Sequence, residues 1–362
     1  MKNLIFLILA LLAWPGGGCG AAKAAKEAGA EAVVAPAAPD GEWAVVNTSC
    51  VFMRGEASYT SENVSQSRMG TPVQVLARTG YWVKIRTPEP YEGWVNELTL
   101  APYPADYRSC RRYICIAEYS FVYAEPSMEA ARLSDVRMSD IVRCAVAGKD
   151  EAAAGRGGKG ARNDGWEAVQ LWDGRSGWIP SGDVADFEKW MADSEYRAQG
   201  WSQKSTENAT NHSELAAEIV TTARRFLGAP YMWGGMSAGL FDCSGLVGFC
   251  YFMAGIQLPR DASQQIGCGV PVAFEDMQAG DLVFFGEKRV GHVALCTGPG
   301  RIIHSSQIVR ENSLVAGEPD YYGRNILGIQ RIIGNLPEQN FIRNSSLYFN
   351  HGAPAQPEQN RQ

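Results

Sequence analysis

The feature that most constrains the fold of this 362-residue chain is an internal repeat in its first half. The segment VFMRGEAS at 51–58 aligns with SFVYAEPS at 120–127, an offset of 69 residues. Further on, GYW at 80–82 aligns with DGW at 164–166, an offset of 84 residues. The Gly-rich insertion at 147–163 in the second copy accounts for the 15 additional residues. The repeat predicts two similar structural units ahead of the second half of the chain.

Each copy contains short stretches of alternating apolar and polar residues, such as TPVQVLA and WEAVQL, which are typical of strands in small β-barrels. Two tryptophans recur at the same spacing in each copy, and we expect all four in the barrel cores. They are Trp82, Trp94, Trp166 and Trp178. The early turn, apolar hairpin and closing Gly-Trp-Val or Gly-Trp-Ile resemble bacterial SH3-like domains. We therefore predict SH3-like barrels at 41–105 and 106–190.

The N-terminus has the pattern of an exported protein. Residues 1–19 carry one lysine and then an apolar stretch too short to span a bilayer, as in a signal peptide. Cys19 stands where a lipoprotein cysteine would be acylated, although Gly16 replaces the leucine that is usual three residues earlier. Residues 20–40 are rich in Ala, Lys, Glu and Pro without an aromatic residue, the composition of a tether. We expect an exported lipoprotein of the cell envelope, anchored to the membrane.

Charge and cysteine usage exclude other classes. The net charge of -6, with no basic stripe, argues against a nucleic-acid partner. Nine cysteines in an exported protein suggest disulfides, but the count is odd and the spacings are irregular. Cys110 and Cys115 could pair, whereas Cys250 and Cys296 lie in apolar runs that predict buried thiols. No Cys-x-x-Cys pair occurs, so a zinc ribbon is not expected.

The second half begins with helix signals after a polar segment at 192–212. Ser213 is the expected N-cap and Gly228 the expected C-terminal cap of a helix with one apolar stripe. A second helix is predicted at Cys243–Met253, apolar on every side, with Asp242 as its N-cap. Its first residue would place a sulfur at the positive end of the helix dipole, which predicts a lowered thiol pKa.

The segments DLVFFG, GHVALCTG, RIIHSS and GIQRII predict consecutive strands of one antiparallel sheet. His292 and His304 lie in these strands, whereas His212 and His351 lie in polar segments. A thiol at a helix start near two strand histidines suits nucleophilic catalysis, because one imidazole takes the thiol proton and a second group orients it. The alternatives are a structural thiol with two core histidines, or a zinc site formed by Cys243, His292 and His304.

These residues resemble a known family. The segments YMWGG, FDCSGL, PRDASQQ, AGDLVFF, GHVAL and IIHSS occur in the order and spacing of NlpC-type cell-wall cysteine peptidases, over about residues 205–340. The resemblance implies an α+β protein, with a papain-like (NlpC-type) peptidase domain preceded by two small SH3-like β-barrels. It implies Cys243 as nucleophile, His292 as general base and His304 as the orienting residue. The Tyr231 hydroxyl and the Cys243 N–H would form the oxyanion hole, and no cofactor is required.

Two barrels ahead of this domain resemble the YkfC-like branch, the γ-D-glutamyl-L-diamino acid endopeptidases. The resemblance implies cleavage between D-Glu and meso-diaminopimelate or lysine in peptidoglycan stem peptides with a free N-terminal L-Ala, releasing L-Ala-γ-D-Glu. Such a substrate carries an ammonium group and a carboxylate, so the site needs an anion and either a cation or N–H donors. The candidates are Asp242 and Asp261 for the ammonium, and Arg260, Ser244 and Ser263 for the carboxylate.

Trp233, in the YMWGG segment, is a further substrate-binding candidate. In the YkfC-like branch the first barrel closes the pocket, and Glu92 and Tyr123 are our candidates for this wall. One alternative is an endopeptidase that acts on intact, wall-bound stems, with the barrels as wall-binding modules. Another is a non-catalytic wall-binding lipoprotein, and a third, an acyltransferase of related fold, is not suggested by PRDASQQ or the barrels. We expect a monomer that acts on peptidoglycan-derived peptides and ends in a polar tail at 341–362.

Overall fold

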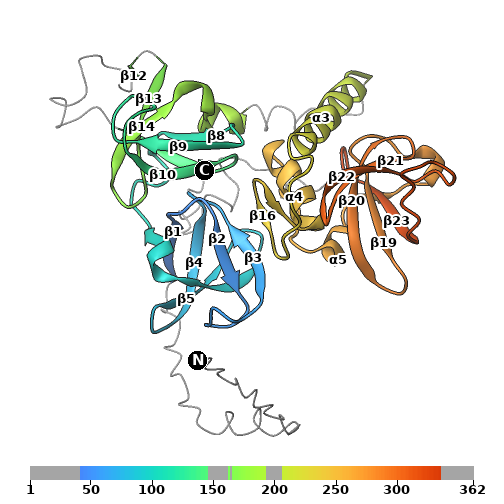
Figure 1. Cartoon of the computed structure of the whole chain (residues 1–362), viewed down its shortest axis with the longest axis horizontal. Helices are drawn as coiled ribbons and strands as arrows, with labels where there is room; N and C mark the ends of the chain where they lie inside the picture. Colours follow the sequence, from blue (N-terminus) through green and yellow to red (C-terminus); the bar gives the residue numbers. More distant parts are fainter. Residues whose placement is uncertain (1–40, 146–161, 164, 193–205, 336–362) are drawn as a thin grey trace, which may run out of the picture.

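The computed structural model describes residues 41–145, 162–163, 165–192 and 206–335. They form two β-barrels followed by an α+β domain (Figure 1). The expected signal peptide, Cys19 and the tether, all within residues 1–40, lie outside the described residues, as does the tail at 341–362. Among the described helices, none is long and apolar enough to cross a membrane.

The two barrels have the same strand order, so the sequence repeat is a repeat of the fold. Barrel one contains β1 (Glu42–Val46), β2 (Val51–Arg54), β3 (Asn63–Ser67), β4 (Pro72–Thr79), β5 (Trp82–Arg86), β6 (Glu92–Asn96) and β7 (Leu100–Pro102). Barrel two contains β8 (Arg112–Cys115), β9 (Tyr119–Tyr123), β10 (Arg132–Arg137), β11 (Ile141–Cys144), β13 (Trp166–Gln170), β14 (Ser176–Pro180) and β15 (Val184–Asp186). Their orders, β3-β2-β6-β5-β4-β1-β7 and β10-β9-β14-β13-β11-β8-β15, correspond strand for strand. A short strand, β12 (Arg162–Asn163), adds to β13 in barrel two.

The prediction that the repeated tryptophans fill the barrel cores is wrong for three of the four. Trp82 is buried, but Trp94, Trp166 and Trp178 are only half-buried. Side chains alternate across a strand, so the residue next to an inward-facing one points to the other side. Val95 and Ile179, each directly after one of these tryptophans, are the residues that enter the cores.

The third domain packs three helices on one antiparallel sheet. The helices are α3 (Thr206–Arg224), α4 (Cys243–Met253) and α5 (Ala262–Gln265), and a hairpin of β16 (Met236–Ser237) and β17 (Leu240–Phe241) leads into α4. The sheet contains β18 (Val270–Pro271), β19 (Leu282–Gly286), β20 (Val290–Gly298), β21 (Arg301–Ser306), β22 (Ile308–Ser313) and β23 (Ile326–Arg331). Its order is β18-β23-β19-β20-β21-β22. The last predicted strand therefore pairs with the first, and β22, which the sequence reading missed, follows β21.

Helix α4 begins and ends at the predicted residues and is capped by Asp242, whose carboxylate accepts the backbone N–H of Gly245 at 2.7 Å. The prediction for α3 is wrong at its start, because the helix begins at Thr206 and Ser213 lies within it. His212 is therefore helical rather than part of a linker. A polar segment can continue a helix when the next turns bury an apolar stripe, here Leu215 and Ile219.

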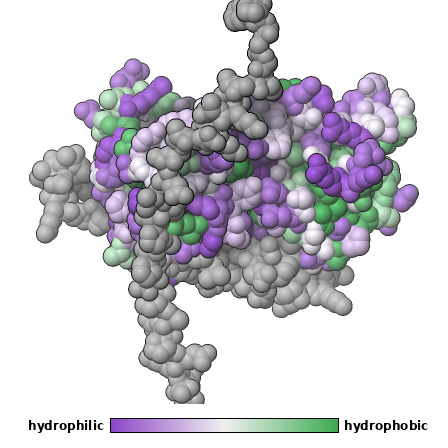
Figure 2. Space-filling model, turned by 90° about the horizontal axis from the view of Figure 1, so that it is seen from below, coloured by the Kyte–Doolittle hydropathy of each residue, from purple (hydrophilic) through white to green (hydrophobic). Residues whose placement is uncertain are grey.

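The eight described cysteines are all free thiols. The suggested pairing of Cys110 with Cys115 is therefore not present, and both side chains are buried. Cys250 and Cys296 are fully buried, as the apolar runs around them predict. On the face seen in Figure 2, hydrophilic residues predominate, and the most extensive hydrophobic area lies on the side of the third domain.

Barrel one is joined to the third domain through β3, which lies beside β16 (Figure 1). The side-chain oxygen of Gln66, a residue 1% exposed, accepts the backbone N–H groups of Met236 at 2.9 Å and Ser237 at 3.0 Å. Next to it, the Ser65 hydroxyl reaches Arg260. Buried polar groups must be paired, so these bonds fix one position of barrel one on the domain that carries Cys243.

The two barrels are joined by a carboxyl group with no solvent exposure. Asp140 accepts hydrogen bonds from the Ser49 hydroxyl at 2.5 Å and from the Met69 N–H at 3.1 Å, both in barrel one. The backbone N–H of Arg137 is its partner within barrel two, at 2.8 Å. Burial raises the pKa of Asp140 to about 8. The interface between the barrels therefore contains a titratable group.

Candidate active site

Cys243 is the first residue of α4, where the chain turns from the β16–β17 hairpin into the helix. The turn is tight, since the Asp242 N–H donates to the Gly235 carbonyl at 3.0 Å. A side chain at position 245 would approach that same oxygen to 1.9 Å, so Gly245 is required there. These backbone contacts fix the place of the thiol at the N-terminal end of a buried helix.

Opposing effects act on the pKa of the Cys243 thiol. Burial raises its pKa to about 11, with a further contribution from Asp242. The backbone N–H groups of Val293 and Ser244 act in the opposite direction, and so does Arg260. The predicted lowering of the thiol pKa is therefore wrong, because desolvation outweighs the helix start and its N–H groups. The contact with Val293 also places the sulfur next to the residue that follows His292.

Two histidines on neighbouring strands form a hydrogen-bonded chain that ends on an asparagine. His292 Nε2 lies 2.7 Å from His304 Nδ1, and His304 Nε2 lies 3.0 Å from Asn312 Oδ1 on β22. The Asn312 amide nitrogen donates to the Asp320 carbonyl at 2.7 Å, which orients the amide. The asparagine oxygen can only accept, so His304 carries its hydrogen on Nε2 and accepts through Nδ1. His292 then donates from Nε2, and its Nδ1 is the basic nitrogen.

Both imidazoles are neutral at pH 7. Burial lowers the pKa of His292 to about 3, helped by the neighbouring His304. Burial likewise lowers the pKa of His304 to about 4, although the bond to Asn312 acts in the opposite direction. The ring of Tyr322 lies 4.5 Å from that of His304 and 5.9 Å from that of His292, and it helps to exclude water from the pair. Sequence reasoning missed Asn312 and Tyr322, because neither belongs to an apolar strand pattern.

Tyr231 lies on the loop before the hairpin. Its backbone is held by a bridge to Phe241 and by a hydrogen bond to the Gln307 carbonyl at 2.8 Å. Burial raises the pKa of its hydroxyl to about 12, with a contribution from the Cys243 thiol. The hydroxyl therefore keeps its proton at neutral pH and can act as a hydrogen-bond donor.

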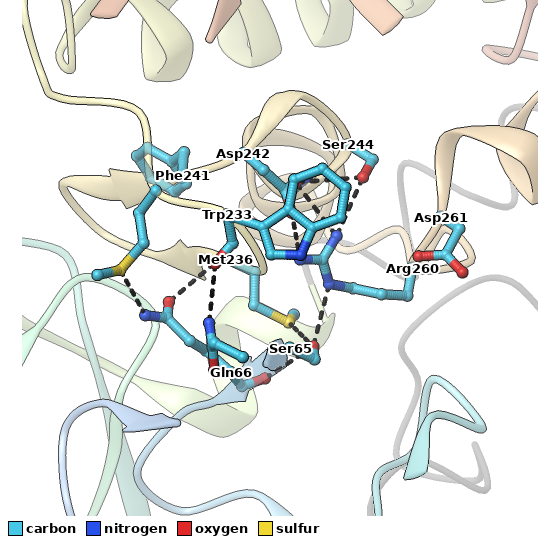
Figure 3. A network of polar contacts seen from close by, with 12 residues as sticks. Ser65, Gln66, Trp233, Met236, Phe241, Asp242, Ser244, Arg260 and Asp261 are labelled. Atoms are coloured by element: carbon cyan, nitrogen blue, oxygen red, sulfur yellow. Dashed lines mark hydrogen bonds and ion pairs between the residues drawn. The ribbon is translucent and has the colours of Figure 1, made fainter. Parts of the chain in front are cut away.

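A buried polar network surrounds Arg260, which is 4% exposed (Figure 3). Its Nη2 contacts the Asp242 carboxylate at 2.6 Å, its Nη1 the Ser244 hydroxyl at 3.0 Å, and its Nε the Ser65 hydroxyl at 3.0 Å. The expected division, with Asp242 binding an ammonium and Arg260 and Ser244 a carboxylate, does not fit this arrangement. Buried charges need partners, and these residues are partners of one another. The network fixes the N-cap of α4, and with it Cys243.

Barrel one contacts the loops around the thiol at two further places. The hydroxyl of Tyr91, in the turn between β5 and β6, lies beside the Asp261 carboxylate, and burial together with that carboxylate raises the pKa of Tyr91. The indole N–H of Trp233 donates to Glu62 at 2.6 Å, and the Trp233 carbonyl accepts the Asn63 amide at 2.9 Å. Trp233 is nonetheless 63% exposed. Tyr91, Glu62 and Asn63 were not found from the sequence, because nothing local indicates which barrel loop meets the third domain.

The two residues expected to form the wall have their partners within their own barrels. The Glu92 carboxylate is ion-paired with Lys84 at 2.8 Å and Arg86 at 2.6 Å within barrel one, and these partners lower its pKa. Tyr123 is 1% exposed inside barrel two, with its ring 5.5 Å from that of Trp166. Ser263 is exposed on α5, two residues after Asp261. Within the described part of the chain, no group of three His, Cys, Asp or Glu side chains is arranged to hold a metal ion.

The fold, with a thiol at a helix start beside paired imidazoles, defines a cysteine peptidase. Comparison with known families agrees: residues 228–330 match the NlpC/P60 family, and residues 49–101 match the bacterial SH3 domain. Residues 228–330 therefore form an NlpC/P60 domain, and a bacterial SH3 domain precedes it in the chain.

Two known proteins are similar over most of the chain, and a third over about a third of it. A γ-D-glutamyl-L-lysine dipeptidyl-peptidase of Bacillus cereus is 28% identical over 283 residues, which cover 74% of this chain and 75% of that protein. The protein of the same name from Bacillus subtilis is 36% identical over 120 residues, 32% of this chain and 40% of that protein. The crystal structure of an NlpC/P60 family protein from Bacillus cereus matches with a TM-score of 0.62 at 21% identity, covering 80% of this chain and 99% of that chain. That structural likeness supports the fold.

Proposed function

We propose that this chain is a cell-envelope cysteine peptidase that hydrolyses the amide between γ-D-Glu and a diamino acid in peptidoglycan stem peptides with a free N-terminal L-Ala. The product is L-Ala-γ-D-Glu. The observation that carries the proposal is the thiol of Cys243 beside the ordered chain of His292, His304 and Asn312. The similarity to proteins named γ-D-glutamyl-L-lysine dipeptidyl-peptidase supports the substrate class.

In the first half of the reaction, Cys243 is the nucleophile. With a thiol pKa of about 11, the proton leaves only as the sulfur attacks, and Nδ1 of His292 receives it. The sulfur bonds to the γ-carbonyl carbon of D-Glu. The Tyr231 hydroxyl and the Cys243 N–H then stabilise the oxyanion, because both donors are in place before charge develops.

The second half returns the site to its starting state. The His292 imidazolium donates its proton to the amine nitrogen of the diamino acid, the C–N bond breaks, and a thioester remains. A water molecule gives its proton to His292 and attacks the thioester carbonyl, which releases L-Ala-γ-D-Glu and restores the thiol. His304 and Asn312 hold the ring of His292 in one tautomer throughout.

Asp261 is the side chain that suits the free ammonium group of the substrate. It is half-buried at the contact with barrel one, where the uncharged Tyr91 hydroxyl lies beside it. An ammonium group of L-Ala would give this carboxylate a charged partner, whereas an acylated or glycan-linked amine would meet barrel one. Trp233 offers an exposed ring to the peptide, and Ser263 is our candidate for the glutamate carboxylate.

The test compares free L-Ala-γ-D-Glu-L-Lys with its N-acetylated form, using the wild type and the Cys243→Ala variant. We expect the wild type to cleave only the free-amine peptide, and the variant to cleave neither. Cys268→Ala is the control, since Cys268 is also a half-buried free thiol. Equal cleavage of both peptides by the wild type would contradict the amine subsite and favour action on intact stems. Cleavage of neither would contradict the peptidase.

We also propose that residues 1–19 direct export, that Cys19 is acylated, and that the enzyme acts as a monomer. The cell-wall role of the NlpC/P60 family supports an extracytoplasmic place of action. Globomycin treatment or a Cys19→Ser variant should move the protein from the membrane fraction to the soluble fraction. Light scattering of residues 41–362 should give the mass of a single chain.

A further inference from the structure

Barrel one exposes a cluster of aromatic rings that the proposed peptidase reaction does not use. Tyr59 is 60% exposed and Tyr81 is 48% exposed, although both rings pack on the buried Trp82. The Tyr59 and Tyr81 ring centroids are 6.1 Å apart and the planes differ by 26°, while the distances to Trp82 are 4.7 Å and 5.6 Å. We call Tyr59, Tyr81 and Trp82 the aromatic platform.

The second barrel shows that the fold does not need these rings. By the offsets of the repeat, Met128 stands at the position of Tyr59 and Gly165 at that of Tyr81, while Trp166 matches Trp82. Both exposed tyrosines are therefore absent from the second copy. A residue that packing required would be expected in both copies, so the two tyrosines call for another explanation.

Two backbone hydrogen bonds at the ends of the platform recur in barrel two, although the turn that carries Tyr81 differs. The N–H of Gly55 donates to the Glu62 carbonyl at 3.0 Å, as Ala124 does to Ala131 at 2.8 Å. At the other end of the platform, the N–H of Glu97 donates to the Tyr81 carbonyl at 2.9 Å, and the equivalent bond in barrel two runs from Ser181 to Gly165, also at 2.9 Å. Gly165 has a φ of 86°, whereas the glycine with positive φ in the turn of barrel one is Gly80, at 55°. Both hydrogen bonds therefore form in barrel two without either tyrosine.

The groups around the rings can form hydrogen bonds and are mostly uncharged. The Asn96 amide donates to the Tyr59 hydroxyl at 2.8 Å, and the hydroxyls of Ser58 and Thr60 lie 2.9 Å apart beside it. Glu97 is the charged side chain next to this group in the sequence. Flat apolar rings surrounded by amides and hydroxyls match a neutral molecule that has an apolar face and a polar edge.

We propose that the aromatic platform of barrel one binds the pyranose ring of a glycan. The C–H face of a sugar ring would stack on Tyr59 and Tyr81, and its hydroxyl and acetamido groups would bond to Asn96, Ser58 and Thr60. The loop that carries Tyr59 continues into Glu62 and Asn63, which hold Trp233, so a bound glycan would lie on the barrel side of the peptidase loops. This inference does not depend on the proposed peptidase activity.

The test uses a tetramer of β-1,4-linked N-acetylglucosamine as the probe and follows tryptophan fluorescence, because Trp82 lies directly under the two tyrosines. The variant is the double substitution Tyr59→Met with Tyr81→Gly, which gives barrel one the residues that barrel two carries at the same positions of the repeat. We expect the tetramer to bind the wild type, and its Kd to rise about tenfold or more in the variant. Cleavage of the free tripeptide should stay at the wild-type level.

Two controls separate stacking from other effects. Tyr119→Ala removes an equally exposed tyrosine, 49% accessible, from barrel two and should leave binding unchanged. Tyr59→Phe with Tyr81→Phe keeps both rings and should bind nearly as the wild type does. Absence of binding to the wild type at millimolar tetramer, or equal binding by the Met/Gly variant, would overturn the proposal. Absence of peptide cleavage by the wild type, with its sugar binding intact, would instead count against the peptidase proposal alone.

Discussion

Removal of one hydroxyl group in barrel one should impair chemistry in a different domain. The Ser65 hydroxyl is the barrel-one partner of the Arg260 Nε, and both side chains are buried. In Ser65→Ala that N–H loses its partner inside the protein. Hydrogen bonds to charged groups contribute about 1.5–3 kcal/mol, so we expect a loss of that size in the free energy of unfolding. Arg260 also contacts Asp242 at the start of α4. If the loss of the Ser65 bond displaces these residues, kcat/KM should fall by about tenfold to 150-fold.

The measurements are urea unfolding and hydrolysis of L-Ala-γ-D-Glu-L-Lys. Ser134→Ala is the matched control, since Ser134 occupies the equivalent place in barrel two and donates to the next carbonyl, at 3.0 Å, as Ser65 does at 3.4 Å. Ser134 has no bond to the peptidase domain among those described. If Ser65→Ala and Ser134→Ala behave alike in both assays, the coupling of barrel one to the thiol is refuted.

Three further predictions concern groups whose surroundings are equally defined. Asn312→Ala should lower kcat about tenfold to a hundredfold with little change in KM, because His304 loses the acceptor that fixes its tautomer. Steady-state kinetics would measure both constants, and a change in KM alone would contradict the prediction. With a pKa of about 11, only about 1 in 10⁴ Cys243 thiols is ionised at pH 7. The rate of alkylation by iodoacetamide should therefore rise about tenfold per pH unit up to pH 10. A rate that is already constant above pH 6 would contradict this prediction. Folding favours the protonated Asp140 carboxyl, whose pKa is raised from 3.8 to about 8, so its contribution to stability is lost as pH rises through that interval. Asp140→Asn should remove up to about 1.4 kcal/mol per pH unit of that dependence in urea unfolding at pH 5 and pH 8, and an unchanged slope would refute the assignment.

The secondary-structure elements that carry the site could be predicted from the sequence, whereas the surroundings of its side chains could not. The bounds of α4 and its Asp242 cap could be predicted because an N-cap followed by a continuous apolar run is a local signal. The strands that carry His292 and His304 were likewise predictable from apolar runs. The thiol pKa was predicted in the wrong direction, since a helix start can be recognised in a sequence but the depth of burial cannot.

Contacts between domains were the part that the sequence did not reveal. Glu92 was proposed for the wall, yet its neighbour Tyr91 makes the contact with Asp261. Adjacent residues of a strand or its turn face opposite ways. A prediction that is wrong by one position therefore selects a residue in a surface ion pair, Glu92, in place of the contact residue, Tyr91. The Ser65 contact with Arg260 spans 195 positions of the chain, and no local pattern indicates such a pair.

That long-range contact also limits how a gene of this kind can change by recombination. Exchange of barrel one for an unrelated barrel would bring Arg260 into the new protein without its hydroxyl partner, and Asp261 without Tyr91. Barrel two has accepted a Gly-rich insertion at 147–163. Exchange of barrel one would therefore require matching changes at Arg260 and Asp261 in the peptidase domain.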